Sequence, residues 1–258
     1  MIDQLGIPIW GETRFALEHA ALRRHPVFRG EGVPGGDGAP VLLVPGFLAG
    51  DISLGVMARW LSRIGYRPCR AGMRANVDCT SRALERLDGQ LVRLAERHGR
   101  RVTIVGQSRG GSMARILAVR RPELVAGVIC LGSPLVDPLA VHPFVRAQVE
   151  AVALLGTLGL RGLFSHACQS GSCCRQARAD ATAAWPQDVA FTAVYSRSDG
   201  IVDWRACLDP HARHVEVRSS HVGMSVNPVV FAVVAKALAG QPRPVGQETS
   251  SRALDILG

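Results

Sequence analysis

A serine lies between two glycines in the segment Gly106-Gln-Ser108-Arg-Gly110. The segment follows an apolar run at 102–105 and precedes a stretch of helical periodicity, which is the strand–turn–helix setting of a nucleophile elbow. At so sharp a turn the glycines let the backbone pass closely, and the serine hydroxyl projects at the helix N-terminus, where developing negative charge is stabilised. A phosphate-binding loop would need Lys followed by Ser or Thr, which this stretch lacks. We therefore predict that Ser108 is an acyl-transfer nucleophile.

An acidic residue follows a later apolar run. Asp199 comes shortly after the run at 189–194, and the glycine that follows it permits a tight bend. The chain order Ser, acid, His puts the acid in this region, so we predict that Asp199 is the acid. Two other aspartates in strand-end loops remain as alternatives, Asp203 and Asp137.

A histidine completes the set. Among the eight histidines, His221 is preferred because it lies in a strand-end loop after the proposed acid. Its imidazole would take the proton of Ser108 during attack and return it to the leaving group, while Asp199 would fix its tautomer. We predict that His221 is the general base.

Short apolar runs alternate with segments of helical period along the chain. This alternation predicts an α/β fold with a mostly parallel sheet and helices on both faces. Such sheets bind ligands at the carboxyl ends of their strands, so the candidate residues would meet at one edge. The expected strands are 41–44, 102–105, 127–131 and 189–194, with a less apolar one near an edge at 214–217; the expected helices are 13–23, 54–64, 83–98 and 113–120.

The 258 residues are expected to form one main domain. An N-terminal helix and a Gly/Pro-rich loop occupy 1–40, and the α/β domain occupies 41–239. The interval at about 137–186 breaks the alternation and carries an apolar helical piece, so we expect a small inserted cap there. The polar stretch 240–258 is expected to be a flexible tail.

This arrangement resembles the α/β-hydrolase superfamily, and more closely its compact bacterial lipases and esterases. The resemblance covers roughly 41–239. The motifs that carry it are Val44-Pro-Gly-Phe47, Gly106-Gln-Ser-Arg-Gly110, Ser198-Asp-Gly-Ile-Val202 and Ser220-His-Val-Gly223. It departs from many lipases at Arg109, where a smaller or apolar residue is common, and this leaves the chemistry of the acyl pocket open.

The resemblance implies a serine hydrolase that cleaves carboxylic esters through a covalent acyl-enzyme, with no metal and no organic cofactor. It also implies an oxyanion hole made by the backbone N–H groups of Phe47 and Arg109. An apolar cap favours an apolar small-molecule ester, although ordinary helix packing explains the same residues. An acyltransferase or thioesterase remains an alternative. A non-catalytic binding protein is disfavoured because all three triad positions carry competent residues.

The charge of +9 suggests polyanion binding, but the positive residues are dispersed arginines, with Lys236 as the single lysine. We therefore expect no nucleic-acid partner. The sequence contains no run of about 18 apolar residues, so no transmembrane segment is predicted. No secretory signal is visible at the N-terminus, so a cytoplasmic location is expected. The oligomeric state is not indicated.

Seven cysteines are present, and three of them lie close together in the cap, at Cys168, Cys173 and Cys174. Their spacing lacks a Cys-x-x-Cys pair, so zinc is not expected, even with His166 and Cys207 as outside candidates for ligands. A disulfide that staples the cap, with Cys207 as a candidate partner, is favoured over zinc and would argue for an oxidising location. The other cysteines are expected to be small core residues, namely Cys69, Cys79 and Cys130.

Overall fold

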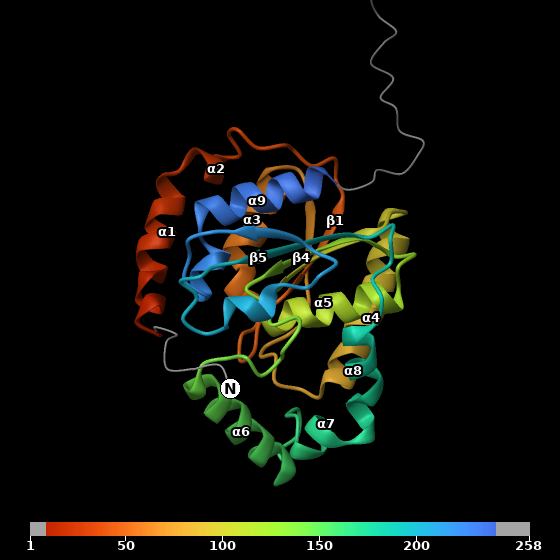
Figure 1. Cartoon of the computed structure of the whole chain (residues 1–258). Helices are drawn as coiled ribbons and strands as arrows, with labels where there is room; N and C mark the ends of the chain where they lie inside the picture. Colours follow the sequence, from red (N-terminus) through yellow and green to blue (C-terminus); the bar gives the residue numbers. More distant parts are fainter. Residues whose placement is uncertain (1–8, 241–258) are drawn as a thin grey trace, which may run out of the picture.

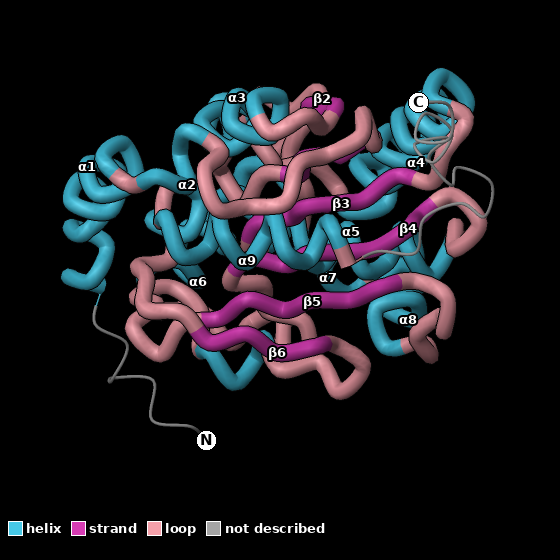
Figure 2. The backbone as a smooth tube through the Cα atoms, turned by 90° about the horizontal axis from the view of Figure 1, so that it is seen from above, coloured by secondary structure: helices cyan, strands magenta, loops and turns pink. Residues whose placement is uncertain are grey.

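The computed structural model describes residues 9–240, which fold around a six-stranded sheet (Figures 1 and 2). The strand order is β2-β1-β3-β4-β5-β6, and every pair of neighbours is parallel. The parallel α/β sheet predicted from the sequence is therefore confirmed. The strands are β1 (Pro40–Val44), β2 (Arg67–Arg70), β3 (Val102–Gln107), β4 (Val125–Leu131), β5 (Ala190–Tyr195) and β6 (Arg213–Glu216).

Helices cover both faces of the sheet, as Figure 1 shows. On one face lie α1 (Phe15–Arg24), α2 (Pro26–Arg29), α3 (Gly55–Arg63) and α9 (Pro228–Ala239); on the other lie α4 (Thr80–His98), α5 (Arg109–Arg120) and α8 (Arg175–Thr182). Strand β1 has buried side chains on both faces. Leu42 packs with the α4 and α5 side, whereas Leu43 packs with the α3 and α9 side. Burial on both faces explains why β1 is a continuous apolar run.

Of the two edge strands, the sequence predicts β6 but not β2. Strand β6 was expected near an edge and lies there. Strand β2 was not expected, because its sequence Arg67-Pro-Cys-Arg70 is polar and contains a proline. An edge strand needs pairing on one side only, so it tolerates proline and charge.

The insertion between β4 and β5 is helical throughout much of its length. It contains α6 (Pro143–Thr157), α7 (His166–Ser170), the 3₁₀ helix η4 (Ser172–Cys174) and α8. Helices α6 and α7 project beyond the sheet in Figure 1, whereas α8 returns to pack against α5. The cysteine-rich segment expected to be a loop is therefore α7 and η4. Residues 9–240 also contain the 3₁₀ helices η2 (Ile9–Arg14), η3 (Asp51–Leu54), η5 (Trp204–Cys207) and η6 (Val222–Ser225).

The ends of the chain are described in part. Helices η2 and α1 span the region of the expected N-terminal helix. The expected tail lies outside the described residues except for Gly240. Within residues 9–240, no helix combines the length and the apolar character needed to cross a bilayer.

Candidate active site

Ser108 lies at the turn between β3 and α5. It has φ 51° and ψ −126°, one of two non-glycine residues with positive φ among those described. Such a backbone conformation costs about 1–3 kcal/mol and persists only where the surroundings enforce it. The turn is tight, because a Cβ on Gly106 would lie 2.5 Å from Gly110 and a Cβ on Gly110 would lie 2.2 Å from the Val44 oxygen. The glycines that flank the serine are therefore required by close packing.

His221 and Asp199 are paired at the ends of the neighbouring strands. His221 follows β6, Asp199 follows β5, and His221 Nδ1 lies 2.7 Å from Asp199 Oδ2. The other carboxylate oxygen of Asp199 accepts hydrogen bonds from the N–H groups of Ile201 and Val202, both at 2.8 Å. Both members of the pair are buried. The carboxylate is thus held in one orientation toward the imidazole.

The environment of His221 favours its protonated form. Burial alone would lower the pKa of His221, but the charge and hydrogen bond of Asp199, together with the charge of Glu12, outweigh it and raise the pKa above its ordinary value. A general base with a raised pKa binds a proton more strongly when it takes one from a nucleophile.

The backbone segments that carry Ser108 and the His221–Asp199 pair contact each other. Gln107, which precedes the serine, donates a side-chain hydrogen bond of 3.0 Å to the His221 carbonyl. The Ser108 N–H donates to the Leu131 oxygen at 2.9 Å. Gly132, which follows Leu131, lies against the pair, since a Cβ there would be 3.1 Å from His221 Nδ1. Within the described residues, no hydrogen bond joins Ser108 Oγ to the His221 ring. Such contacts are often long in unliganded enzymes.

The loop after β1 approaches the serine directly. A Cβ on Gly46 would lie 3.1 Å from Ser108 Cβ and 3.8 Å from its Oγ. The next residue, Phe47, forms an isolated parallel bridge with Asn76. The amide of Asn76 donates to the Pro45 oxygen at 2.8 Å and so fixes this loop. Strands β1 and β3 flank the point where the strand order reverses, which is where open α/β sheets bind ligands.

Arg109 begins α5, where backbone N–H groups have no partner within the helix. Its side chain donates to the Asn76 oxygen at 2.8 Å, the Asp78 oxygen at 2.7 Å and Thr80 Oγ1 at 3.2 Å. Burial lowers the pKa of Arg109 to about 10, against the opposing effect of Asp78. The long side chain thus supports the segment after Asn76.

The other two candidate acids have separate partners. The carboxylate of Asp203 accepts from Arg205 N at 3.0 Å and begins η5. The carboxylate of Asp137 accepts from Leu139 N at 3.0 Å in an exposed loop. Of the three aspartates, Asp199 is the one that contacts His221.

A glutamate that the sequence did not single out binds both loops of the pair. Glu12 Oε1 accepts from the N–H groups of Gly200 at 3.1 Å and His221 at 2.8 Å, and its Oε2 accepts from Val222 at 2.9 Å. Glu18 reinforces the contact by accepting from the N–H and hydroxyl of Ser220. The N-terminal segment is therefore part of the support of the site. Glu12 in η2 and Glu18 in α1 carry no local sequence signal of this role.

The family model named Esterase, with the description "Putative esterase", matches residues 78–214. The chain belongs to this family. The matched segment includes Ser108 and Asp199 and ends before His221. None of the curated proteins matches.

Solved structures of esterases and lipases share the fold. The mature lipase BlEst2 of Bacillus licheniformis is 17% identical with a TM-score of 0.59, over 80% of this chain and 94% of that one. Monoglyceride lipase of Saccharomyces cerevisiae is 14% identical with a TM-score of 0.55, over 80% and 88%. Carboxylesterase CesB of Bacillus subtilis is 14% identical with a TM-score of 0.50, over 90% and 99%. The α/β-hydrolase fold that the motifs implied is therefore confirmed.

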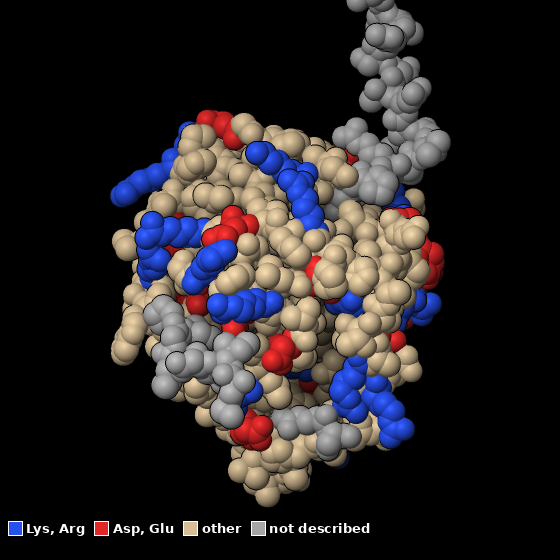
Figure 3. All heavy atoms as spheres, viewed as in Figure 1, with Lys and Arg blue, Asp and Glu red and all other residues tan. Residues whose placement is uncertain are grey.

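The exposed arginines of this esterase come from many segments of the chain. On the face in Figure 3 they lie among acidic residues and uncharged surface. Several of them pair with carboxylates, such as Arg86 with Asp78 at 2.6 Å and Arg121 with Asp88 at 2.7 Å. A hollow of about 850 Å³ lies near the amino ends of β1 and β2, beside Gly38 and Arg97, and is lined by none of the candidate catalytic residues.

All seven cysteines are free in this esterase. The disulfide between the cap and Cys207, which the spacing favoured over zinc, is therefore not formed in this structure. Cys207 is buried in η5 in a cluster with Val141, Val202 and Ala206 that includes none of the insertion's cysteines. Cys79 is buried as expected, but its Sγ lies 3.6 Å from that of Cys174.

Proposed function

We propose that this protein is a serine carboxylic ester hydrolase in which Ser108 is the nucleophile, His221 the base and Asp199 the orienting acid. The observation that carries the proposal is the His221–Asp199 pair, with its 2.7 Å contact, beside a serine held at φ 51° between a strand and a helix. Membership of the Esterase family supports the same reaction class.

In the proposed reaction, Ser108 Oγ attacks the ester carbonyl carbon while its proton passes to Nε2 of His221. Nε2 is the ring nitrogen available for this role, because Nδ1 faces Asp199. The backbone N–H groups of Phe47 and Arg109 donate hydrogen bonds to the carbonyl oxygen and stabilise the negative charge that develops on it. The alcohol leaves with the proton from His221, and a water molecule then hydrolyses the acyl-enzyme by the reverse proton transfers.

We infer that the acyl group is apolar. Phe47 packs against an apolar cluster of the insertion formed by Val152, Ala153 and Phe164. The ring centroids of Phe47 and Phe164 are 6.1 Å apart. An acyl chain bound with its carbonyl oxygen at the Phe47 N–H would meet this cluster, and burial of each additional CH₂ group would contribute about 0.8 kcal/mol.

The proposal is tested with p-nitrophenyl esters of increasing acyl length, using the wild-type protein and Ser108→Ala. Replacement of the nucleophile is expected to lower kcat by several orders of magnitude, since loss of a protease serine costs about 10⁶-fold. Ser112→Ala is the matched control, because Ser112 lies one turn further along α5 and donates to the Pro134 oxygen. This variant should retain activity.

Covalent labelling gives a second readout. A fluorophosphonate should modify Ser108 in the wild-type protein and leave the Ser108→Ala variant unlabelled, as determined by peptide mass spectrometry. Equal ester hydrolysis by the wild-type protein and Ser108→Ala, or labelling at another serine, would contradict the proposal.

A further inference from the structure

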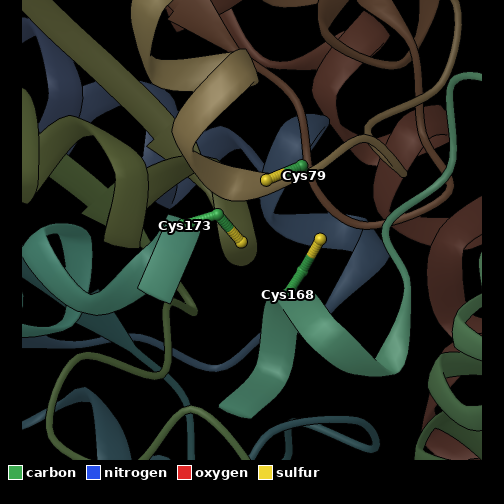
Figure 4. A group of neighbouring side chains, drawn as sticks. All are labelled: Cys79, Cys168 and Cys173. Atoms are coloured by element: carbon green, nitrogen blue, oxygen red, sulfur yellow. The ribbon is translucent and has the colours of Figure 1, made fainter. Parts of the chain in front are cut away.

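Four thiols from three segments gather beside the start of α4. Cys79 precedes α4, Cys168 lies in α7, and Cys173 and Cys174 lie in η4. The sulfurs of Cys79, Cys168 and Cys173 are all within 4.8 Å of one another, and Figure 4 shows them directed toward a common space. Cys174 Sγ adjoins the group, at 3.6 Å from Cys79 Sγ and 3.8 Å from Cys173 Sγ.

The distances of 3.6 and 3.8 Å from Cys174 Sγ to the sulfurs of Cys79 and Cys173 are those of a tetrahedral thiolate centre, and the 4.8 Å limit for Cys79, Cys168 and Cys173 leaves room for one ion among them. With a zinc–sulfur bond of about 2.3 Å, the sulfurs at the corners of a tetrahedron lie about 3.8 Å apart. We propose that Cys79, Cys168, Cys173 and Cys174 bind one zinc ion. The ligands come from segments up to 95 residues apart, so the Cys-x-x-Cys pattern of many zinc sites is not needed for them to converge.

Hydrogen bonds favour ionised sulfur at two of the four cysteines, Cys168 and Cys174. Burial opposes ionisation of Cys168, but the N–H and hydroxyl of Ser165, with the neighbouring thiols, bring its pKa below the ordinary value. Burial likewise opposes ionisation of Cys174, and the hydrogen bonds of Ser81 and Cys79 lower its pKa. Burial raises the pKa of Cys79 to about 12, and the pKa of Cys173 is also raised. Zinc binding would release the protons that remain on the four sulfurs.

A half-buried cation, Arg109, lies next to the cluster. The guanidinium of Arg109 donates to the oxygens of Asn76, Asp78 and Thr80, and forms no salt bridge with a carboxylate among the described residues. Besides Asp78, the groups that favour its charge are the sulfurs of Cys174, Cys79 and Cys168. Zinc with four thiolates carries a net charge of −2, so Arg109 would supply a countercharge for the centre.

The centre would connect the insertion to the body of the enzyme. Three of its ligands lie in α7 and η4, whereas Cys79 lies at the start of α4. Arg109 follows the proposed nucleophile directly and its side chain contacts the same region. The bound ion would therefore hold the cap segment in place beside the elbow. This proposal is independent of the proposed reaction.

The protein is tested after reduction and removal of metal, by titration with Zn²⁺ in competition with a chromophoric chelator. We expect about one zinc per chain. Titration with Co²⁺ should give the sulfur-to-metal charge-transfer absorption and the intense visible bands of tetrahedral thiolate coordination. Freshly purified protein should also contain zinc by elemental analysis.

Two ligand variants avoid the core, since Cys173 is exposed and Cys168 is only partly buried. Loss of a group that merely supports a ligand costs 10–100-fold in metal affinity, so Cys168→Ser and Cys173→Ser should weaken Zn²⁺ binding by at least about 100-fold. Cys174→Ser should weaken binding as well. Cys69→Ser is the control, because this free thiol lies on β2 outside the cluster, and it should bind zinc as the wild type does.

Several results would overturn the proposal. Absence of stoichiometric binding by the reduced wild-type protein would do so, as would equal affinity in Cys168→Ser and Cys69→Ser. Retained affinity in Cys174→Ser would exclude the four-thiolate site. A disulfide needs sulfurs about 2.05 Å apart. If freshly purified protein contains no zinc and the thiols of Cys79 and Cys174 are both lost to thiol-specific labelling, these two residues form a disulfide, and the metal centre is excluded.

Discussion

Glu12 joins the N-terminal segment to the candidate base. One carboxylate accepts hydrogen bonds from three N–H groups, which belong to the loops that carry Asp199 and His221. Its charge also contributes to the raised pKa of His221, after the larger effects of burial and of Asp199. Hydrogen bonds to a charged acceptor are stronger than those between neutral groups. Glu12 therefore acts as a positioning residue with an electrostatic effect on the base.

Glu12→Gln is expected to shift the pH dependence of activity. The amide removes the negative charge, so the pKa of His221 falls. Because the base must be neutral to accept a proton, the acidic limb of the kcat/KM profile should move to lower pH, by up to about one unit. The amide group of glutamine has one acceptor oxygen instead of two, so at least one of the hydrogen bonds from the loops of Asp199 and His221 is lost. Because these loops position the base, kcat should fall.

The shift is measured with an activated ester across the acidic range. Glu31→Gln is the matched control, since Glu31 pairs with Arg29 on the surface of the same N-terminal region. Its profile should coincide with that of the wild type. A Glu12→Gln variant with lower kcat and an unmoved acidic limb would restrict Glu12 to a purely structural role.

Among the secondary-structure elements, those buried on both faces could be predicted from the sequence. The central strands β1, β3, β4 and β5 are continuous apolar runs, because helices cover both of their faces, and the loops after them could be located from sequence. Edge strand β2 and helices α7 and α8 lack such a signal. Asp199 and His221 could be paired in advance because their order follows the strands.

The contacts that could not be predicted cross long stretches of chain. Glu12 meets His221 over 209 residues, and Cys79 meets Cys174 over 95. Neither residue stands out in its own segment, since an acidic residue in a short helix and a cysteine before a helix are both ordinary. The packing of η2 against η6 and of η4 against α4 brings these groups together.

Two helix glycines predict opposite effects of one substitution. A Cβ on Gly156 of α6 would lie 2.1 Å from the backbone oxygen of Phe164, whereas a Cβ on Gly89 of α4 would meet only the end of the Arg93 side chain, at 3.5 Å. Gly156→Ala should therefore destabilise the cap by about 1–3 kcal/mol through overpacking. Gly89→Ala should stabilise the protein by roughly 0.5–1 kcal/mol, because alanine favours the helix.

Hydrogen exchange tests the effect at Gly156, and denaturant unfolding tests the effect at Gly89. In Gly156→Ala, amides of α6 and of the 163–165 loop should exchange faster while those of the central strands keep their protection. In Gly89→Ala, the midpoint of denaturant unfolding should rise. A neutral Gly156→Ala would mean that α6 does not pack on Phe164 in solution.

At the scale of the whole molecule, a buried ion pair joins three parts of the chain. Arg115 of α5 contacts Asp209, before β6, at 2.6 Å, and the two side chains are only 4% and 3% exposed. The same guanidinium donates to the oxygens of Asp180 and Ala183, where the insertion returns to the body, both at 3.2 Å. Burial would raise the pKa of Asp209, but Arg115 and the N–H of His211 lower it below the ordinary value.

Removal of one partner should leave the other as an uncompensated buried charge, so Asp209→Asn is expected to lower the free energy of unfolding by about 3–5 kcal/mol. Asp188→Asn, in which the carboxylate of the surface pair with Arg101 is 67% exposed, is the control and should cost no more than about 1 kcal/mol. The lowered pKa of Asp209 sets the sign with pH. Its stabilisation is complete above the unfolded-state pKa of about 3.9 and is lost as the pH falls through the lower folded-state value. Denaturant unfolding at neutral and acidic pH should therefore bring the wild type and Asp209→Asn closer together in acid, and a difference that stays constant would contradict this account of the pair.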